Sequence, residues 1–489
     1  MSGLCSLFLY FTPRINNPPR LHMEHSANKQ STLLHLITEY EAMSQKGDIA
    51  VFEEKTFFTL IQFYESEFSA EKALEVIDHA LEIYAYSVDF YLRKAELLFN
   101  VRQYSQADVV ITQAENLAPN DILVSLMRAR YKGLTKNHHE ALAIIEHLKS
   151  EKESQLLTEI LLTEAFIYDQ SKEYEKQFAV LSQLLRKDHS NLVALEKICT
   201  AVENTKRYNE SIELHQQIID KDPYSYQAWY NLAHAYSCTH EYERAIDAYE
   251  YVYIINKDFE AAYRDRGDLC LELCNYKEAL KSFKEANDVF GADSDTLTNI
   301  GQCLIHLNQS KHARKYLTKA LKIDPYNEEL HYYIGLSFAK ERSWVNAINA
   351  FKRALEMDDT REEYLASLGD AYFHLNEFSK ATFYFKKAIK EGPEQSFIWM
   401  SYANFLLATN RIKESLLVLE KGEYFANCVE LTYVKSAAYF LLEDSINGMK
   451  VLEEALQTDP ELHSVLFSYA PHLMVNHDIQ SMINYYSTQ

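Results

Sequence analysis

Residues 230–250 read YNLAHAYSCTHEYERAIDAYE, in which Ala233 and Ala245 are each followed within a few residues by a tyrosine, Tyr236 and Tyr249. A single amphipathic helix does not require alanine at fixed places inside its apolar stripe. A small residue held at such a place indicates that another element packs closely against it. Because repeated sequence means repeated architecture, the first question is whether the pattern returns at a fixed interval.

The pattern returns every 34 residues. Steps of 34 from Ala233 reach Gly267, Gly301, Gly335 and Gly369, and the same steps from Ala245 reach Ala279, Ala313, Ala347 and Ala381. A large residue follows each alanine of the second series, as Tyr249, Phe283, Leu317, Phe351 and Phe385. Trp229 and Trp399 are 170 residues apart, which is five such steps. Five prolines share one position of the unit, namely Pro119, Pro223, Pro325, Pro393 and Pro460.

The unit has the pattern of two packed helices. Apolar residues recur three and four places apart, as in Ala279, Phe283 and Ala286, which indicates a helix with one buried face. Proline cannot continue a helix and therefore marks the end of a unit. Only 11 Gly residues are present, and no alternating strand pattern is evident. We therefore expect an all-α fold in which each helix pair buries its stripe against the next pair, giving a solenoid with a long concave surface.

This pattern resembles the tetratricopeptide repeat family, whose 34-residue helix-turn-helix unit has small residues, aromatics and a proline at the same positions. The resemblance implies a right-handed superhelical solenoid of about twelve units. One elongated array is expected over residues 54–461. The units begin near Glu54, Val88, Ile122, Thr158, Leu192, Tyr226, Glu260, Ser294, Glu328, Glu362, Ser396 and Val429.

Atypical sequence is expected at both ends of the array because terminal units must cover an open apolar end. Residues 23–53 are expected to hold a capping helix and residues 462–489 a closing helix or two. Residues 1–22 are interpreted as a disordered extension, with Met23 as an alternative natural start. An export signal is the other interpretation of the apolar run from Leu4 to Phe11, but no positive residue precedes it and no small-residue cleavage site follows.

The fourth unit departs most from the pattern, with Glu164 and Gln177 where leucine and alanine are usual. It follows the third unit after 36 residues, and the charged insert at residues 150–155 lies at this joint. Two interpretations remain open for the insert. It is either a hinge in the array or the end of a longer second helix.

Chemistry-bearing motifs are absent from the sequence. The seven Cys include no close pair of the zinc type, and Cys270 and Cys274, four residues apart, have no partner pair at ligand spacing. His138 and His139 are interpreted as exposed turn residues. No phosphate-binding glycine loop, nucleophile elbow or helical zinc motif is present. We therefore expect a non-enzymatic protein without cofactor or metal, and its thiols favour a cytoplasmic setting.

The remaining function is binding. The family resemblance implies that positions 2, 5, 6, 9, 12 and 13 of the first helices line the concave groove. Aromatic rings beside charges suit an extended peptide or a partner helix. No unit has the lysine and asparagine pair that grips chaperone tails in this family. The expected groove residues are Tyr230, His234, Arg264, Asp268, Asn299, Tyr332, Tyr333 and Asp370, with Asp295, Glu329 and Glu363 at equivalent positions.

Charge narrows the class of partner. The chain has 71 acidic and 49 basic residues, a formal net charge of −22 at pH 7 with histidine neutral. Phosphate backbones would be repelled over most of this surface, so nucleic acid is disfavoured. No segment approaches the roughly 20 apolar residues of a membrane span. The sequence favours a cytoplasmic protein-binding scaffold for basic or amphipathic segments. A component of an envelope or secretion assembly and a self-associating structural protein are the alternatives.

Overall fold

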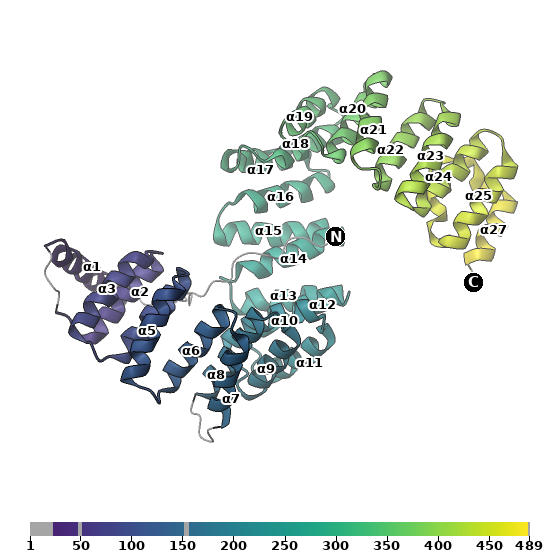
Figure 1. Cartoon of the computed structure of the whole chain (residues 1–489). Coiled ribbons are helices and arrows are strands. Elements are labelled where there is room, and N and C mark those ends of the chain that lie inside the picture. Colours follow the sequence, from purple (N-terminus) through teal and green to yellow (C-terminus); the bar gives the residue numbers. More distant parts are fainter. Residues whose placement is uncertain (1–22, 47–50, 151–155, 488–489) are drawn as a thin grey trace. The chain divides into compact units, whose positions relative to one another are not determined.

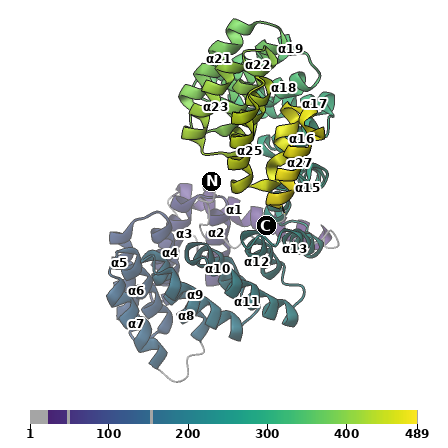
Figure 2. The same ribbon diagram turned by 90° about the vertical axis from the view of Figure 1, so that its right-hand side faces the viewer.

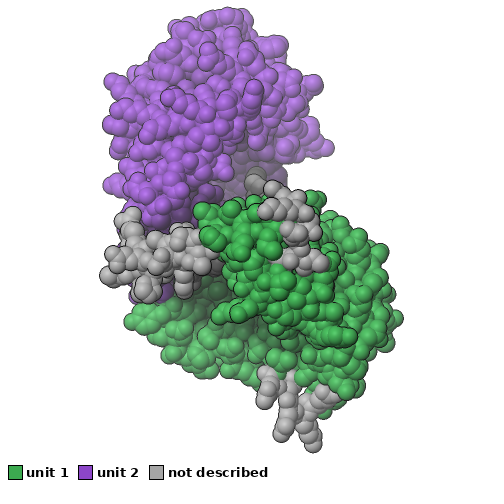
Figure 3. Space-filling view, turned by 90° about the vertical axis from the view of Figure 1, so that its left-hand side faces the viewer, with its two compact units in different colours: residues 1–239 green, residues 240–489 purple. Residues whose placement is uncertain are grey.

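The computed structural model describes residues 23–46, 51–150 and 156–487. The extension expected over residues 1–22 lies outside these ranges, and of the proposed hinge only residue 150 lies inside them. Contacts divide the chain into two compact units, residues 1–239 and residues 240–489, which Figure 3 shows in different colours.

Unit 1 is built of helices alone in its described residues, and consecutive helices pack side by side (Figure 1). Its helices are α1 (Met23–Lys46), α2 (Glu54–Ser66), α3 (Ala70–Ile83), α4 (Val88–Asn100), α5 (Tyr104–Leu117), α6 (Ile122–Leu134), α7 (His138–Ser150), α8 (Leu157–Gln170), α9 (Tyr174–Lys187), α10 (Leu192–Thr205), α11 (Tyr208–Lys221) and α12 (Tyr226–Cys238).

Unit 2 is likewise helical throughout its described part, so the predicted all-α class is confirmed. Its α-helices are α13 (Tyr242–Ile255), α14 (Glu260–Glu272), α15 (Tyr276–Phe290), α16 (Ser294–His306), α17 (Ser310–Ile323), α18 (Glu328–Lys340), α19 (Trp344–Met357), α20 (Glu362–His374), α21 (Phe378–Glu391), α22 (Ser396–Ala408), α23 (Ile412–Ala426), α24 (Val429–Leu441), α25 (Ser445–Thr458), α26 (Ser464–Tyr469) and α27 (His477–Ser487), with short 3-10 helices η2 (Pro460–His463) and η3 (Pro471–Val475).

The repeated small residue of each first helix faces a large side chain of its own second helix. A Cβ atom added at Gly335 of α18 would lie 2.4 Å from the Phe351 ring of α19, and one added at Gly301 would lie 2.5 Å from Leu317. Both partners are fully buried or nearly so, and the alanines of the second series are also buried. Close crossing of the paired helices therefore explains why these positions are restricted to small residues.

The two tryptophans of the repeat make the same contact 170 residues apart. Trp229 Nε1 donates a hydrogen bond to the Pro223 carbonyl oxygen at 2.9 Å, and Trp399 Nε1 donates to the Pro393 carbonyl oxygen at 2.7 Å. Each bond ties a first helix to the turn that precedes it. The spacing of five repeats is thus a spacing of equivalent structural positions.

The turn inside each pair has one residue in left-handed backbone geometry, and none of these residues is glycine. In most of these turns the next amide donates to a carbonyl five residues back, as from Gln103 N to Leu98 O at 2.8 Å, which is the Schellman arrangement. The twelve residues have φ between 54° and 65° and are Phe68, Arg102, Lys136, Lys172, Lys206, His240, Cys274, Asn308, Arg342, Asn376, Asn410 and Glu443.

The unusual residues of the pair α8 and α9 are buried. Glu164 is 7% exposed and forms an ion pair with Lys149, which lies in the last turn of the preceding helix α7. Gln177 is 2% exposed, its Nε2 donates to Asp169 Oδ1 at 3.4 Å, and its Oε1 has no hydrogen-bond partner. The pair therefore keeps its packing although two core positions are polar.

A buried polar network replaces an aromatic ring in the pair α10 and α11. His215 is 1% exposed, and its Nδ1 lies 2.7 Å from the Ser211 carbonyl oxygen, so this nitrogen must carry the proton. Its Nε2 then accepts from Asn231 Nδ2 at 3.0 Å. Burial lowers the pKa of His215 to about 4, so the network holds a neutral imidazole at pH 7.

Atypical elements close the two ends. In unit 1, Ile37 and Tyr40 of α1 are buried against α2 and α3, and Tyr40 Oη is 2.7 Å from His79 Nδ1. In unit 2, Leu466 of α26 and Ile479 of α27 are buried in one cluster with residues of α24 and α25. Figure 2 shows α27 beside α25.

Candidate partner-binding face

The first helices of successive pairs in unit 2, from α14 to α24, make contacts that place them side by side. Asn299 Nδ2 of α16 donates to Asp268 Oδ1 of α14 at 3.4 Å. The rings of Tyr332 on α18 and Tyr364 on α20 have centroids 4.8 Å apart. Helices α16 and α18, α20 and α22, and α22 and α24 also pack together. We call the positions 2, 5, 6, 9, 12 and 13 of these six helices the first-helix face.

Six exposed carboxylates of this face come from four of its helices: Asp268 and Glu272 of α14, Asp295 of α16, Glu329 of α18, and Glu363 and Asp370 of α20. Although water reaches the Asp268 carboxylate, desolvation by the surrounding protein, followed by repulsion from Asp265 and Glu272, raises its pKa to about 6. Desolvation likewise raises the pKa of Asp370 and of Glu363. These three carboxyl groups are thus accessible but incompletely compensated by neighbouring positive charge.

Positive charge on the same face is either neutralised or sparse. Arg264 Nη2 is bound by Glu260 Oε1 at 2.7 Å and by Asp293 Oδ2 at 3.3 Å. His306 stacks on Tyr276 with centroids 4.1 Å apart, and burial, followed by the charge of Lys340, lowers its pKa. His374 stacks on Trp344 in the same way at 4.1 Å. The first-helix face of unit 2 is therefore predominantly acidic.

The two expected tyrosines on α18 belong partly to the packing between repeats. Tyr332 and Tyr333 are each half-buried, with ring centroids 5.7 Å apart. The Tyr332 ring also lies 5.7 Å from that of Phe351 and 4.8 Å from that of Tyr364. Burial raises the pKa of Tyr333, and the nearby Glu329 contributes in the same direction. Only the exposed parts of these rings are available to a partner.

Two residues expected in the groove lie in unit 1 instead. Tyr230 and His234 are both on α12 and are half-buried, and His234 Nε2 lies 3.3 Å from Glu203 Oε1 of α10. The other six expected residues lie on α14, α16, α18 and α20 of unit 2. A hydrogen bond joins Asp268 with Asn299, and the rings of Tyr332 and Tyr333 are in contact. Arg264 instead forms ion pairs with Glu260 and Asp293.

Unit 1 has charged residues on the equivalent face that the sequence analysis did not single out. Arg93 of α4 pairs with Glu65 of α2 and, at 2.9 Å, with Glu96. Arg130 of α6 lies 3.3 Å from Glu96 as well. All four occupy positions 6, 9 or 12 of their helices, so applying the same position rule to the weaker repeats would have found them. Here acid and base neutralise each other, unlike the face of unit 2.

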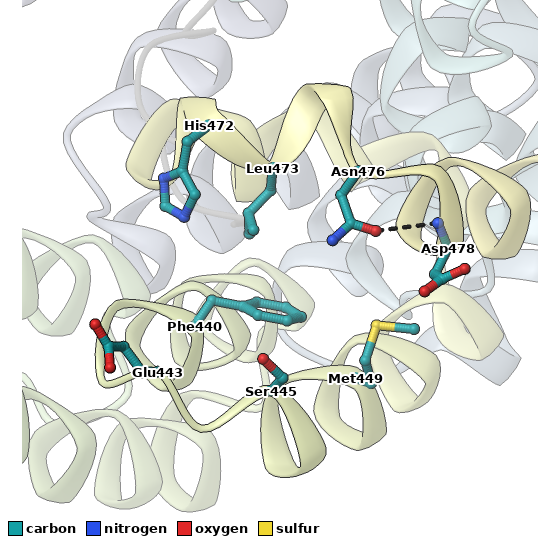
Figure 4. Close-up of a pocket in the computed structure, with 8 residues that line it drawn as sticks. All are labelled: Phe440, Glu443, Ser445, Met449, His472, Leu473, Asn476 and Asp478. Carbon is teal, nitrogen blue, oxygen red and sulfur yellow. Dashed lines mark hydrogen bonds between the residues drawn. The ribbon is translucent and has the colours of Figure 1, made fainter.

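A cavity of about 360 Å³ lies at the C-terminal end of unit 2. Its apolar wall is formed by Phe440 of α24, Met449 of α25 and Leu473 of η3, and Figure 4 shows Leu473 and Phe440 facing each other across it. Glu443 and Asp478 are among the polar residues that line it. The cavity can accept an apolar side chain beside a positive charge.

Metal and membrane features are absent from the described part of the chain. No group of three or more His, Cys, Asp or Glu side chains there is placed to hold a metal ion. Its six cysteines are free, with Cys270 buried and Cys274 exposed. None of the helices described is long and apolar enough to cross a membrane.

Comparisons with known proteins match this chain to repeat proteins. Residues 216–247, 294–327 and 332–396 match three models of the tetratricopeptide repeat family. Protein CTR9 homolog of Arabidopsis thaliana is 24% identical over 262 residues, covering 50% of this chain and 23% of its own. Anaphase-promoting complex subunit 3 of Schizosaccharomyces pombe is 21% identical over 322 residues, covering 65% of this chain and 46% of the relative's own length. The chain thus spans less than half the length of these two relatives.

Other similar proteins are covered more completely. The TPR repeat-containing protein YpiA of Bacillus subtilis is 20% identical over 374 residues, covering 74% of this chain and 85% of YpiA. Among solved structures, yeast Tom70 matches with 16% identity and a TM-score of 0.43, covering 87% of this chain and 98% of Tom70. YrrB matches with 24% identity and a TM-score of 0.32, covering 39% of this chain and 98% of YrrB.

Proposed function

The chain is a tetratricopeptide-repeat protein, and from that premise we propose that it is a non-enzymatic cytoplasmic scaffold that holds segments of partner proteins on its first-helix face. Proteins built from this repeat generally bind other proteins, and the family models that match the chain are all models of the repeat itself. The partner-binding residues we assign on this face are Asp268, Asn299, Asp370 and the exposed parts of Tyr332 and Tyr333, with Arg264 beside them. Tyr230 and His234 of α12 in unit 1 are proposed as partner-binding residues of their own unit.

The observation that carries this proposal is the row of accessible carboxylates on the successive first helices α14, α16, α18 and α20, of which Asp268, Glu363 and Asp370 are incompletely compensated by positive charge. A lysine or arginine of a partner that reached Asp268 or Asp370 would complete the compensation that Arg264 and His374, 3.9 Å from Asp370, provide only in part. Hydrogen bonds between ionised groups are about twice as strong as neutral ones. The same charges oppose a nucleic-acid backbone. The preferred ligands are therefore basic or amphipathic protein segments.

The proposal can be tested by comparing captured proteins. Asp268→Asn with Asp370→Asn removes two charges from the face while preserving side-chain shape. Asp220→Asn with Asp247→Asn removes two exposed charges from the second helices α11 and α13 and serves as the matched control. Each protein is immobilised, exposed to native-cell lysate and analysed by mass spectrometry, and circular dichroism checks its helix content.

The expected result is a set of proteins retained by the unchanged protein and the control but lost from the double face variant. Identical sets from all three would contradict binding at this face. A captured set consisting of the chain itself, with a mass that rises with concentration, would instead favour the self-associating alternative.

A further inference from the structure

The solvent-facing stripe of α22 carries no charge. The helix reads SFIWMSYANFLLA and contains no Asp, Glu, Lys or Arg. Phe397 is 39% exposed, and Asn404 and Ala408 are also exposed. These residues, with Met400 and Ser401 between them, recur three and four places apart and share one side of the helix. A solvated stripe in a chain with 25% charged residues would be expected to include charge.

The neighbouring helix on one side is acidic in the same register. On α20 the equivalent exposed positions are Glu363, Asp370 and His374. Helix α20 packs against α22, and Asp370 and Asn404 are 34 residues apart. The first-helix face of unit 2 therefore changes from acidic to uncharged between adjacent helices.

The C-terminal end of the neighbouring helix on the other side continues the uncharged surface to the cavity, whereas the N-terminal end of that helix carries Glu430. Phe440 and Leu441 of α24 hold the positions of Leu407 and Ala408 on α22, and Leu441 is 36% exposed. Helix α22 packs against α24. Phe440 is also part of the apolar wall of the 360 Å³ cavity, together with Leu473 (Figure 4). Uncharged surface thus leads from Phe397 along α22 towards this cavity.

From this juxtaposition we propose that the partner is a two-part segment, with lysine or arginine against the carboxylates of α18 and α20 and apolar side chains against α22, α24 and the cavity beside Phe440. The inference rests on the proposed function and names the chemistry of its ligand. Charge complementarity selects the occupant, because a purely apolar segment would leave Asp370 with only the partial compensation of His374 at 3.9 Å, and a purely basic one would leave Phe397 and Leu441 in water.

The helix spacing sets the length of such a segment. Packed helices have axes about 8–10 Å apart, so the three spacings from α18 to α24 amount to roughly 27 Å. An extended chain covers about 3.3 Å per residue. About eight residues therefore reach from the carboxylates of α18 to the cavity.

A library of displayed twelve-residue peptides, selected on the intact protein, tests the inference. Dissociation constants of enriched peptides are measured by fluorescence anisotropy at low and high salt. Asn404→Glu places a charge in the uncharged stripe, and Asn349→Glu makes the same change on the exposed side of α19 as the matched control. Asp370→Asn removes one carboxylate, and Asn404→Gln verifies that position 404 tolerates a neutral side chain.

The enriched peptides are expected to carry a basic cluster beside an apolar cluster. Asn404→Glu should weaken their binding at least tenfold without flattening its salt dependence, whereas Asp370→Asn should weaken it several-fold and flatten that dependence. Asn349→Glu and Asn404→Gln should change the dissociation constant less than twofold.

Two results would overturn the inference, and only the second would also overturn the proposed function. Basic peptides without an apolar cluster, indifferent to Asn404→Glu but weakened by Asp370→Asn, would remove the two-part ligand and leave the proposed function in place. Peptides indifferent to both substitutions, or no enrichment above an unrelated control protein, would remove both.

Discussion

The close crossing of α18 and α19 predicts an unusual outcome for a conservative substitution, Gly335→Ala. Replacing glycine by alanine inside a helix ordinarily stabilises it by about 1 kcal/mol. Here the new Cβ would lie 2.4 Å and 2.5 Å from two atoms of the Phe351 ring. That ring is 1% exposed, so it must shift within the packed core to make room. The steric cost of packing the new methyl group should therefore oppose the gain in helix propensity.

The size of the effect follows from comparing the two terms. Ordinary contacts between carbon atoms lie at about 3.5–4.0 Å, so the overlap is more than 1 Å. Inserting a methyl group into a packed core costs about 1–3 kcal/mol, and this overlap indicates the upper end. The net destabilisation at Gly335 is thus about 2 kcal/mol. At Gly369 the nearest contacts with Phe385 are 3.0 Å, so the lower end applies and Gly369→Ala should be nearly neutral.

Hydrogen exchange measured by mass spectrometry reports this difference locally, which matters because long repeat arrays need not unfold in a single step. Amides of α18 and α19 should exchange roughly 30-fold faster in Gly335→Ala, since 1.4 kcal/mol corresponds to a factor of ten. Unit 1 should not change. Adding Phe351→Leu should restore part of the protection, because Ala403 and Leu419 already form this combination in another repeat. Unchanged or slower exchange in Gly335→Ala would refute the close-packing argument.

Three further predictions concern stability. Folding lowers the pKa of His215 from 6.5 to about 4, so stability that is present above pH 6.5 is lost as the pH falls towards 4. The expected loss in the free energy of unfolding is about 3 kcal/mol. His215→Gln should remove this loss, which urea titrations at pH 7 and pH 4.5 measure. Equal pH dependence of both proteins would contradict it. Trp399→Phe keeps an aromatic ring but loses the indole N–H and its bond to the Pro393 carbonyl, so exchange in α22 should rise at least about fivefold, corresponding to about 1 kcal/mol, and no rise would show that the bond contributes nothing. Lys149→Met leaves Glu164 buried without its partner, so the melting temperature should fall and recover in part with Glu164→Gln, whereas an unchanged melting temperature would contradict a role for the pair.

Much of the fold follows from local sequence because the repeat imposes the same steric demand in each pair. Gly267, Gly301 and Gly335 are restricted by contacts inside one helix pair, and such contacts recur at a fixed interval. The ion pair of Lys149 with Glu164 joins consecutive pairs across the irregular 36-residue spacing. Its partner could not be read from the repeat register.

The sequence predicts where the residues of the candidate site lie, but it does not predict which side chains are already engaged in ion pairs or ring packing. The position rule places Asp268 near Asn299, which are joined by a hydrogen bond. It does not reveal that Arg264 is already bound by Asp293, or that the Tyr332 ring packs on Tyr364. These contacts depend on side-chain reach between repeats, whereas the register fixes only the backbone positions.

The central claim, that partner segments bind the first-helix face of unit 2, is tested most directly by site-specific photocrosslinking in living cells. A photoreactive amino acid replaces Asn299 on that face or, as the control, Asn349 on α19. The account predicts crosslinked partner proteins from position 299 that diminish when Asp268→Asn and Asp370→Asn are added, and none from position 349. Partners crosslinked from position 349, or crosslinks at position 299 that do not respond to the two substitutions, would contradict it.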